Sequence, residues 1–328
     1  MFRVGLNPYG LAYTLGMQGA GTARANDRPI GMAGFVAIAR EIGARCIELD
    51  GRWLTAMTDA ELSRARDDLA GETVICSYWL AQREGETLAE AVRCTAAVGG
   101  GLIRLHLTPV LEGSRAAWGP RWAEMVAHGR ATLLREAVRA RDAGLAMAVE
   151  DHQDFGSEEL LEMTADAGDN VGIVFDTGNP FSVGEDPVDF ARRAGPRIRH
   201  VHLKDYVAQH TDEGFRLVRC AIGDGCVPFA EIAAVLRARG SSLTASIEPG
   251  ALESRHIRLF TSDWWNGYPA RSARELGTAL ARLRRNRLDE GADPRTPWER
   301  GAPRDEVIAY EMAQVRRSVE NLRTMGFM

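Results

Sequence analysis

The amino-acid sequence predicts a (β/α)₈ barrel followed by a helical extension. Short apolar runs rich in β-branched residues occur eight times and alternate with amphipathic stretches of helical periodicity. Four of these runs end in a side chain of metal-ligand type, within the segments LAMAVEDHQDF, VGIVFDTGNPF, IRHVHLKDY and LTASIEPG. A charged group that ends an apolar strand needs a polar rim to avoid the core. Parallel strands closed into a barrel supply that rim, because their carboxyl ends all face one side.

The predicted strands follow the apolar runs, and the predicted helices fill the intervals between them. The strands are expected at residues 2–8, 46–51, 73–79, 102–109, 145–152, 171–177, 198–205 and 243–249. The helices are expected at residues 31–43, 59–70, 86–99, 121–143, 157–168, 186–195 and 228–239. An open doubly wound sheet is the main alternative. It is disfavoured because no Gly-rich phosphate-binding loop follows the first strand.

The chain is long enough for one large barrel and a further segment. We assign residues 1–255 to the barrel and residues 256–328 to an extension that packs on the barrel or lies at an oligomer or partner surface. Helices are expected in the extension at 271–285 and 305–325. Its loop carries three aromatic side chains, which we interpret as packing anchors, with a lid over the barrel mouth or an oligomer surface as alternatives. These three are Trp264, Trp265 and Tyr268.

Composition excludes several classes of function. The net charge of -5 provides no basic field that would attract a polyanion, so a nucleic-acid partner is not expected. No apolar run approaches the ~18 residues of a membrane span, and the N-terminal segment lacks the features of a signal peptide. The five cysteines are odd in number and are typical of reduced thiols. We therefore expect a cytoplasmic protein that does not bind membranes.

The ends of the strands are expected to share one mouth. Successive side chains of a strand point to opposite faces, so Glu150 and His152 share a face, as do His202 and Lys204. Many charges on one small rim repel or desolvate one another unless a cation or a substrate organises them. The mouth is expected to hold Glu48, His106, Glu150, His152, Asp176, His202, Lys204 and Glu248. Three of its carboxylates and one imidazole would form a mixed oxygen and nitrogen ligand set for a divalent ion.

The segments AVEDHQDF, FDTGNP, HVHLKD and SIEPG resemble the xylose isomerase-like TIM barrel superfamily, which includes sugar-phosphate isomerases/epimerases and ketose 3-epimerases. The resemblance covers about residues 1–250 and has the four motifs in the right order on the last four strands. It implies one divalent metal ion, with Mn²⁺ as the first choice and Mg²⁺, Co²⁺ or Zn²⁺ as alternatives. The implied metal ligands are Glu150, Asp176, His202 and Glu248.

The resemblance also implies an activity on a small-molecule sugar or keto-sugar. Removal of the proton next to a carbonyl produces an enediolate, and a Lewis-acid metal stabilises its charge. In the family the two glutamates, here Glu150 and Glu248, exchange protons on either face of that carbon. Acid–base assistance of this kind contributes about 10²–10⁴-fold to a rate. The leading hypothesis is therefore a metal-dependent isomerase or epimerase.

Three positions depart from the ketose 3-epimerase pattern. Asn179 occupies the place of a substrate-binding His, Gly156 that of a Glu and Ala208 that of an Arg, which disfavours a free-sugar 3-epimerase. Endonuclease IV belongs to the same superfamily, but the additional His ligands of its three-zinc cluster are not evident. A non-catalytic binding protein is also disfavoured, because burying an intact ligand set without a metal is costly.

His152 adds a second hypothesis. It lies two residues beyond a ligand glutamate, where it is expected either to act as a base or to orient a carboxylate. This arrangement resembles the large subunits of bacterial C-glycoside deglycosidases, which cleave a 3-keto-C-glycoside together with a small β-rich subunit. Keto-inositol dehydratases use the same proton abstraction. The alternative activity is thus that of a lyase, and the expected assembly is a homo-oligomer or, for the lyase, a hetero-oligomer with a small β subunit.

The substrate is expected to contact further polar and aromatic side chains of the mouth. A lone Lys204 and few Arg residues disfavour a strongly phosphorylated substrate, although Arg104 and Lys204 could hold one such group. Trp265 is a candidate platform for an aromatic aglycone. The candidate substrate contacts are His106, Lys204, Glu48, Asn179 and Trp265.

Overall fold

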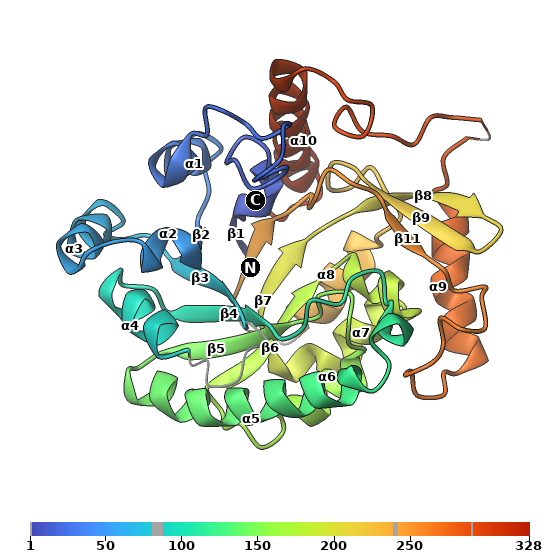
Figure 1. The fold of residues 1–328 in the computed structure, drawn as a ribbon, viewed down its shortest axis with the longest axis horizontal. Coiled ribbons are helices and arrows are strands. Elements are labelled where there is room, and N and C mark those ends of the chain that lie inside the picture. Colours follow the sequence, from blue (N-terminus) through green and yellow to red (C-terminus); the bar gives the residue numbers. More distant parts are fainter. Residues whose placement is uncertain (1, 81–87, 239–241, 290) are drawn as a thin grey trace.

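The computed structural model contains a closed barrel of eight parallel strands, as the sequence predicts (Figure 1). The structure describes residues 2–80, 88–238, 242–289 and 291–328. The strand order around the barrel is β1-β10-β7-β6-β5-β4-β3-β2. The barrel strands are β1 (Phe2–Leu6), β2 (Ile47–Asp50), β3 (Val74–Trp79), β4 (Leu102–His106), β5 (Ala146–Glu150), β6 (Val171–Asp176), β7 (Ile198–Leu203) and β10 (Leu243–Ile247).

Helices surround the barrel, and all of those described except the short α2, which was not predicted, fall where the sequence predicts. Thr58 and Glu61 form a capping box at the start of α3, and the Asp186 side chain accepts hydrogen bonds from the first turn of α7. In the described part of the chain, no helix has the length and apolarity needed to cross a membrane. The helices before the extension are α1 (Gly31–Glu41), α2 (Gly51–Thr55), α3 (Asp59–Asp68), α4 (Ala89–Ala97), α5 (Arg121–Asp142), α6 (Ser157–Thr164), α7 (Pro187–Ala194) and α8 (Phe229–Arg237).

Shorter helical turns link these elements, and two predicted helices reach beyond what the structure describes. Residues 86–87 and 239, which the sequence assigns to helices, lie outside the described ranges. The short 3₁₀ turns are η1 (Pro8–Leu11), η2 (Arg115–Trp118), η3 (Asn179–Val183) and η4 (Gly195–Arg197).

The core lies between the strands and the surrounding helices. Phe175 of β6 stacks on Phe190 of α7 with ring centroids 5.0 Å apart, and both rings are fully buried. Gly5 allows β1 and the start of β2 to approach closely, because a Cβ at this position would lie 1.9 Å from the Cys46 carbonyl oxygen. Close packing of this kind fixes the strand ends, from which the polar side chains of the mouth project.

A three-stranded antiparallel sheet lies beside the barrel mouth, and the sequence analysis did not anticipate it. It consists of β8 (Tyr206–Thr211), β9 (Gly214–Arg219) and β11 (Arg255–Ile257). The buried carboxylate of Asp205 holds the loop behind this sheet by accepting hydrogen bonds from four backbone N–H groups. Those groups belong to Tyr206, Gly223, Gly225 and Val227, so residues 223–226 form a turn that this carboxylate holds.

The extension contributes α9 (Ala273–Arg285) and α10 (Arg304–Thr324). Glu311 of α10 accepts hydrogen bonds from the backbone N–H groups of Tyr13 and Thr14, at 2.9 and 2.8 Å. Phe327, just after α10, stacks on Phe2 of β1 with centroids 4.9 Å apart. The last helix therefore packs on the outside of the barrel (Figure 1). A domain division at residue 255 stays a prediction.

The aromatic loop of the extension packs against the loop after β4. Trp264 is buried and stacks on Tyr268 at 4.6 Å, and its Nε1 donates to the Glu112 carbonyl oxygen. The Tyr268 hydroxyl donates to the Gly113 carbonyl oxygen at 2.8 Å. These contacts are those of packing anchors, which was the first of the three interpretations of this loop.

Candidate metal centre

The four predicted metal ligands meet at one end of the barrel. Glu150 ends β5, Asp176 ends β6, His202 lies near the end of β7 and Glu248 directly follows β10. Each offers one oxygen or nitrogen atom, and these atoms all lie within 4.8 Å of one another. The strand register explains the convergence, because Asp176 is paired with His202 across the β6–β7 ladder. All four side chains are buried.

The His202 ring is fixed between carboxylates on both sides. Its Nδ1 lies 3.2 Å from Glu150 and 2.8 Å from Glu248, whereas its Nε2 lies 3.1 Å from both carboxylate oxygens of Glu48. Although burial disfavours the charged ring, Glu48 and Glu248 raise the pKa of His202 to about 9. When the ring carries a single proton, on Nε2 and donated to Glu48, Nδ1 faces Glu150 and Glu248 with a free lone pair, as a metal-binding imidazole needs.

Two cations balance the ligand carboxylates. Arg104 pairs with Glu150, and Lys204 contacts both Asp176 and Glu248, the latter at 2.9 Å. Burial raises the pKa of Asp176, although the nearby Lys204 opposes this rise. Burial would also raise the pKa of Glu248, but Lys204 and His202 outweigh this effect and lower it. Three buried carboxylates around one imidazole form a donor set that suits Mn²⁺, Mg²⁺, Co²⁺ or Zn²⁺. The residues present therefore fit a divalent ion.

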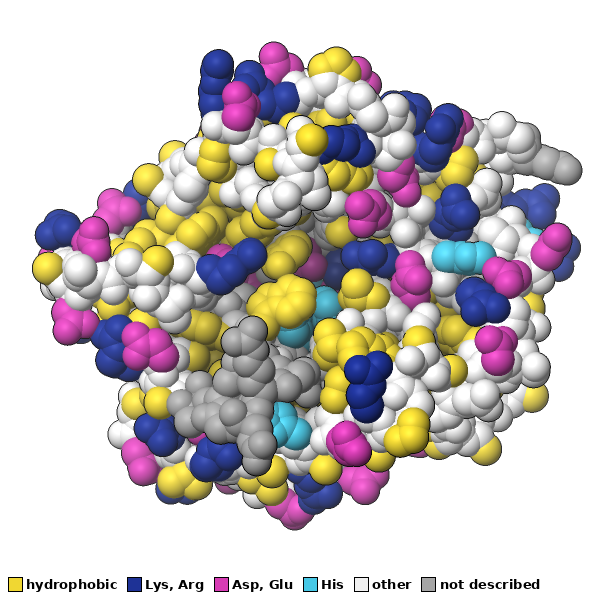
Figure 2. Space-filling model, in the orientation of Figure 1, with side chains coloured by type: hydrophobic (Ala, Val, Ile, Leu, Met, Phe, Trp, Pro, Cys, Tyr) yellow, Lys and Arg dark blue, Asp and Glu magenta, His cyan; other side chains and the backbone are white. Residues whose placement is uncertain are grey.

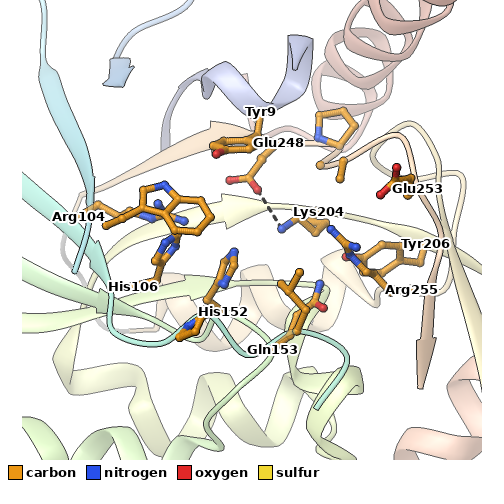
Figure 3. A pocket seen from close by; sticks show the side chains of 16 residues that line it. Tyr9, Arg104, His106, His152, Gln153, Lys204, Tyr206, Glu248, Glu253 and Arg255 are labelled. Atoms are coloured by element: carbon orange, nitrogen blue, oxygen red, sulfur yellow. Dashed lines mark ion pairs between the residues drawn. The ribbon is translucent and has the colours of Figure 1, made fainter. Parts of the chain in front are cut away.

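A pocket opens beside these ligands at the barrel mouth (Figure 3). Figure 2 shows histidine side chains in the central hollow of this face. Glu248 is the ligand that lines the pocket, so its carboxylate reaches both the centre and the space for a substrate. The polar and aromatic residues of the lining are Tyr9, Trp79, Arg104, His106, His152, Gln153, Lys204, Tyr206, Glu248, Glu253 and Arg255.

Two imidazoles form one wall of the pocket. The rings of His106 and His152 lie 4.2 Å apart, and the half-exposed Trp79 ring packs edge-on against His106 with centroids 3.7 Å apart. Among the described residues, neither ring nitrogen of His106 has a hydrogen-bond partner, and neither does Nδ1 of His152. Burial lowers the pKa of both rings well below the usual value. Both are therefore neutral at pH 7, and each can accept or donate a hydrogen bond.

The structure brings two of the five predicted substrate contacts, His106 and Lys204, to the pocket. Glu48 lies two residues before the end of β2, where its carboxylate is fully buried against His202 and accepts a hydrogen bond from Ser77. Strand alternation correctly gives it an inward direction, but its depth in the barrel keeps it away from the pocket lining. Glu48 is therefore a partner of a metal ligand.

Asn179 and Trp265 also lie away from the pocket lining. The Asn179 side chain is buried behind Gln153, whose Nε2 donates to its Oδ1 at 3.3 Å. Trp265 donates its Nε1 to the Leu259 carbonyl oxygen and packs edge-on against Trp264 within the extension. An aromatic side chain anchored in this way provides packing for the extension.

Several lining residues were missed by sequence reasoning. Trp79 is the last residue of β3, so the rule that selects strand ends could have found it. Tyr9 follows β1 within the η1 turn, and Gln153 follows β5 in a left-handed backbone conformation, φ 64°. Tyr206 and Arg255 belong to the additional antiparallel sheet, for which the sequence pattern gave no signal.

Comparison with known proteins establishes the family. Residues 36–258 match the xylose isomerase-like TIM barrel family, and the chain belongs to it. The sequence is 26% identical to the uncharacterised Escherichia coli K12 protein YihM over 203 residues, and this alignment covers 60% of each of the two chains. It is 37% identical over 79 residues to inosose dehydratase of Lacticaseibacillus casei, which is 23% of this chain and 26% of the dehydratase. The alignments thus span less than two thirds of either curated relative.

The fold is also similar to that of solved enzymes. The structure of an L-ribulose 3-epimerase superposes with a TM-score of 0.56 at 19% sequence identity, covering 87% of this chain and 96% of the epimerase. The chain is thus similar to an inosose dehydratase in part of its sequence and to a sugar epimerase in its fold.

Glu48→Gln tests the link between Glu48 and the metal centre. Loss of the carboxylate that holds His202 is expected to weaken binding of Co²⁺ to the chelator-treated protein about 10- to 100-fold. The measurement is titration calorimetry of the folded variant. Glu253→Gln is the matched control, because Glu253 lines the pocket without contacting His202. Equal Co²⁺ affinity in both variants would show that Glu48 does not support the ligand.

Proposed function

We propose that this protein is a divalent-metal-dependent enzyme that removes the proton next to a carbonyl group of a sugar or keto-sugar and returns it as an isomerase or epimerase. One observation carries the proposal. The four candidate ligands lie next to a pocket that Glu248 also lines, and two neutral imidazoles form one wall of that pocket. The ligands would be Glu150, Asp176, His202 and Glu248. A bound divalent ion would supply Lewis-acid stabilisation of the negative charge that develops on the carbonyl oxygen.

In this proposal Glu248 and His152 transfer the protons. Both line the pocket, whereas Glu150 is covered by Arg104 and His202 and does not line it. Lys204 orients Glu248 by contacting its Oε1 at 2.9 Å, and the second oxygen lies toward His202. His152 enters from β5 with a neutral ring, so its nitrogen can accept a proton at pH 7. Glu150 serves as a ligand.

A lyase is the second candidate, and the His106 and His152 pair favours it. Of these two neutral imidazoles 4.2 Å apart, one can accept the proton and then, as an imidazolium, pass it to a departing oxygen or carbon. The other can donate an N–H hydrogen bond to the same group. The aligned segment of inosose dehydratase supports the same activity. Both candidates share the first proton removal and differ in the fate of the resulting anion.

Proton NMR in D₂O tests the shared step. The metal-loaded protein is incubated with ketoses, keto-inositols and 3-keto-glycosides, and deuterium is followed at the carbon next to the carbonyl. Exchange with formation of a stereoisomer or an aldose–ketose product supports the isomerase. Exchange with release of water or an aglycone supports the lyase. Absence of exchange in the whole panel, with the metal bound, counts against the proposed chemistry.

Glu248→Gln is expected to lower turnover of the substrate found in this panel by at least about 10³-fold, because it removes a carboxylate that serves as both ligand and acid–base group. The far-ultraviolet circular dichroism spectrum should remain that of the folded barrel. Unchanged turnover in a metal-loaded sample would remove Glu248 from the proposed site.

His152→Ala separates the two roles of this imidazole. A base role predicts a fall in kcat of about 10²–10⁴-fold with metal content unchanged, as measured by elemental analysis of the same sample. A role in orienting Glu150 instead predicts loss of metal. His128→Ala on α5, outside the pocket lining, is the matched control and should retain both metal and kcat.

A further inference from the structure

Among the described residues, three cationic side chains line the pocket, and they differ in their partners. Arg104 pairs with Glu150, and Lys204 pairs with Asp176 and Glu248, so both serve the ligand carboxylates. Arg255, by contrast, makes no ion pair or side-chain hydrogen bond with any residue in the described ranges. The positive charge of Arg255 is therefore available to a molecule in the pocket.

The backbone holds Arg255 in place. β11 pairs with β9 in an antiparallel ladder that sets Arg255 opposite Leu217. On one side the His256 N–H donates to Glu112 at 3.1 Å, and on the other the Ser254 N–H donates to Glu299 at 3.0 Å. Because the backbone is fixed before the ligand arrives, only the side-chain torsions of Arg255 have to be ordered on binding.

The surroundings of Arg255 suit an anion. Figure 3 shows Arg255 beside Tyr206 and across the pocket from His106. Glu253 is the acid of the lining that lies nearest in sequence, and its Oε1 accepts hydrogen bonds from Gln18 and Trp298, each at 3.2 Å. Glu253 is thus held by other partners and forms no ion pair with Arg255. A guanidinium stays charged in proteins and binds carboxylate or phosphate oxygens through paired N–H groups.

We infer that Arg255 binds an anionic group, a carboxylate or a phosphate monoester, carried by the substrate. This inference rests on the proposed function and adds the charge of the substrate to it. The sequence had suggested Arg104 and Lys204 for a single such group, but in the structure both are paired with ligand carboxylates. Arg255 takes over that role at the side of the pocket opposite His106, and the acid–base groups lie between them.

Calorimetric binding to the Mn²⁺-loaded protein tests the inference without requiring turnover. The probes are two pairs of keto compounds that differ in charge, 3-dehydroshikimate with scyllo-inosose and D-ribulose 5-phosphate with D-ribulose. The wild-type protein is expected to bind the anionic member of one pair about 10- to 100-fold more tightly, the range for a hydrogen-bonded charge pair. The pair that shows the preference distinguishes a carboxylate from a phosphate.

Arg255→Gln should abolish this preference and leave the affinity for the neutral compound within about twofold, whereas Arg255→Lys should retain part of it. Arg258→Gln is the matched control, because it removes the same charge from an arginine that pairs with Glu213 at the surface. Equal wild-type affinities within both pairs, or a preference that survives Arg255→Gln, would overturn the inference.

The deuterium exchange experiment distinguishes failure of this inference from failure of the proposed function. Exchange in the wild-type protein that is no faster with the anionic member than with the neutral member of either pair would overturn the inference alone. Arg255-dependent anion binding without exchange in any compound would overturn the proposed chemistry and leave the anion site in place.

Discussion

The burial of three carboxylates around one imidazole is the constraint on which the rest of the site depends. Like charges at such short range are unfavourable in a medium of low dielectric constant, so the barrel needs cations beside them. Arg104 and Lys204 supply two, and the ligand set supplies the place for a third, divalent one. This demand explains why Arg104 and Lys204 are both paired with carboxylates of the candidate ligands.

The barrel holds the buried polar side chains in place at more than one depth. Below the ligands, His200 is held by Thr244 and Ser246 at 2.7 and 3.0 Å, and Glu48 joins this layer to His202. Glu48, His200 and His202 therefore each have partners that fix their orientation, as a preorganised site requires. The cluster of Glu48, His200 and His202 supports the candidate metal centre through hydrogen bonds, because both ring nitrogens of His200 already contact hydroxyl groups.

The sequence predicted the barrel and the four ligands because both follow from periodic patterns. Alternation along a strand gives the direction of a side chain, and the parallel sheet gives a common rim. Neither gives depth, so Glu48 was assigned to the pocket although it lies below it. Arg255 could not be found in this way, because its three-residue strand forms only through pairing with β9. The structure places Trp265 against Leu259 and Trp264 within the extension, which the sequence could not show because an aromatic residue does not itself indicate the surface that it packs against.

The ligand side of the pocket and the side formed by His106 and His152 differ in charge. The ligand side is rich in fixed charge, which suits the oxygen on which negative charge develops, whereas the His106 and His152 side is neutral. A neutral imidazole can take up a proton and then return it either to the opposite face of the same carbon or to a leaving group. The first course gives an epimer and the second an elimination. The choice therefore depends on which substrate group lies against His106, and the anchor at Arg255 on the far side would determine how the substrate is turned toward that wall.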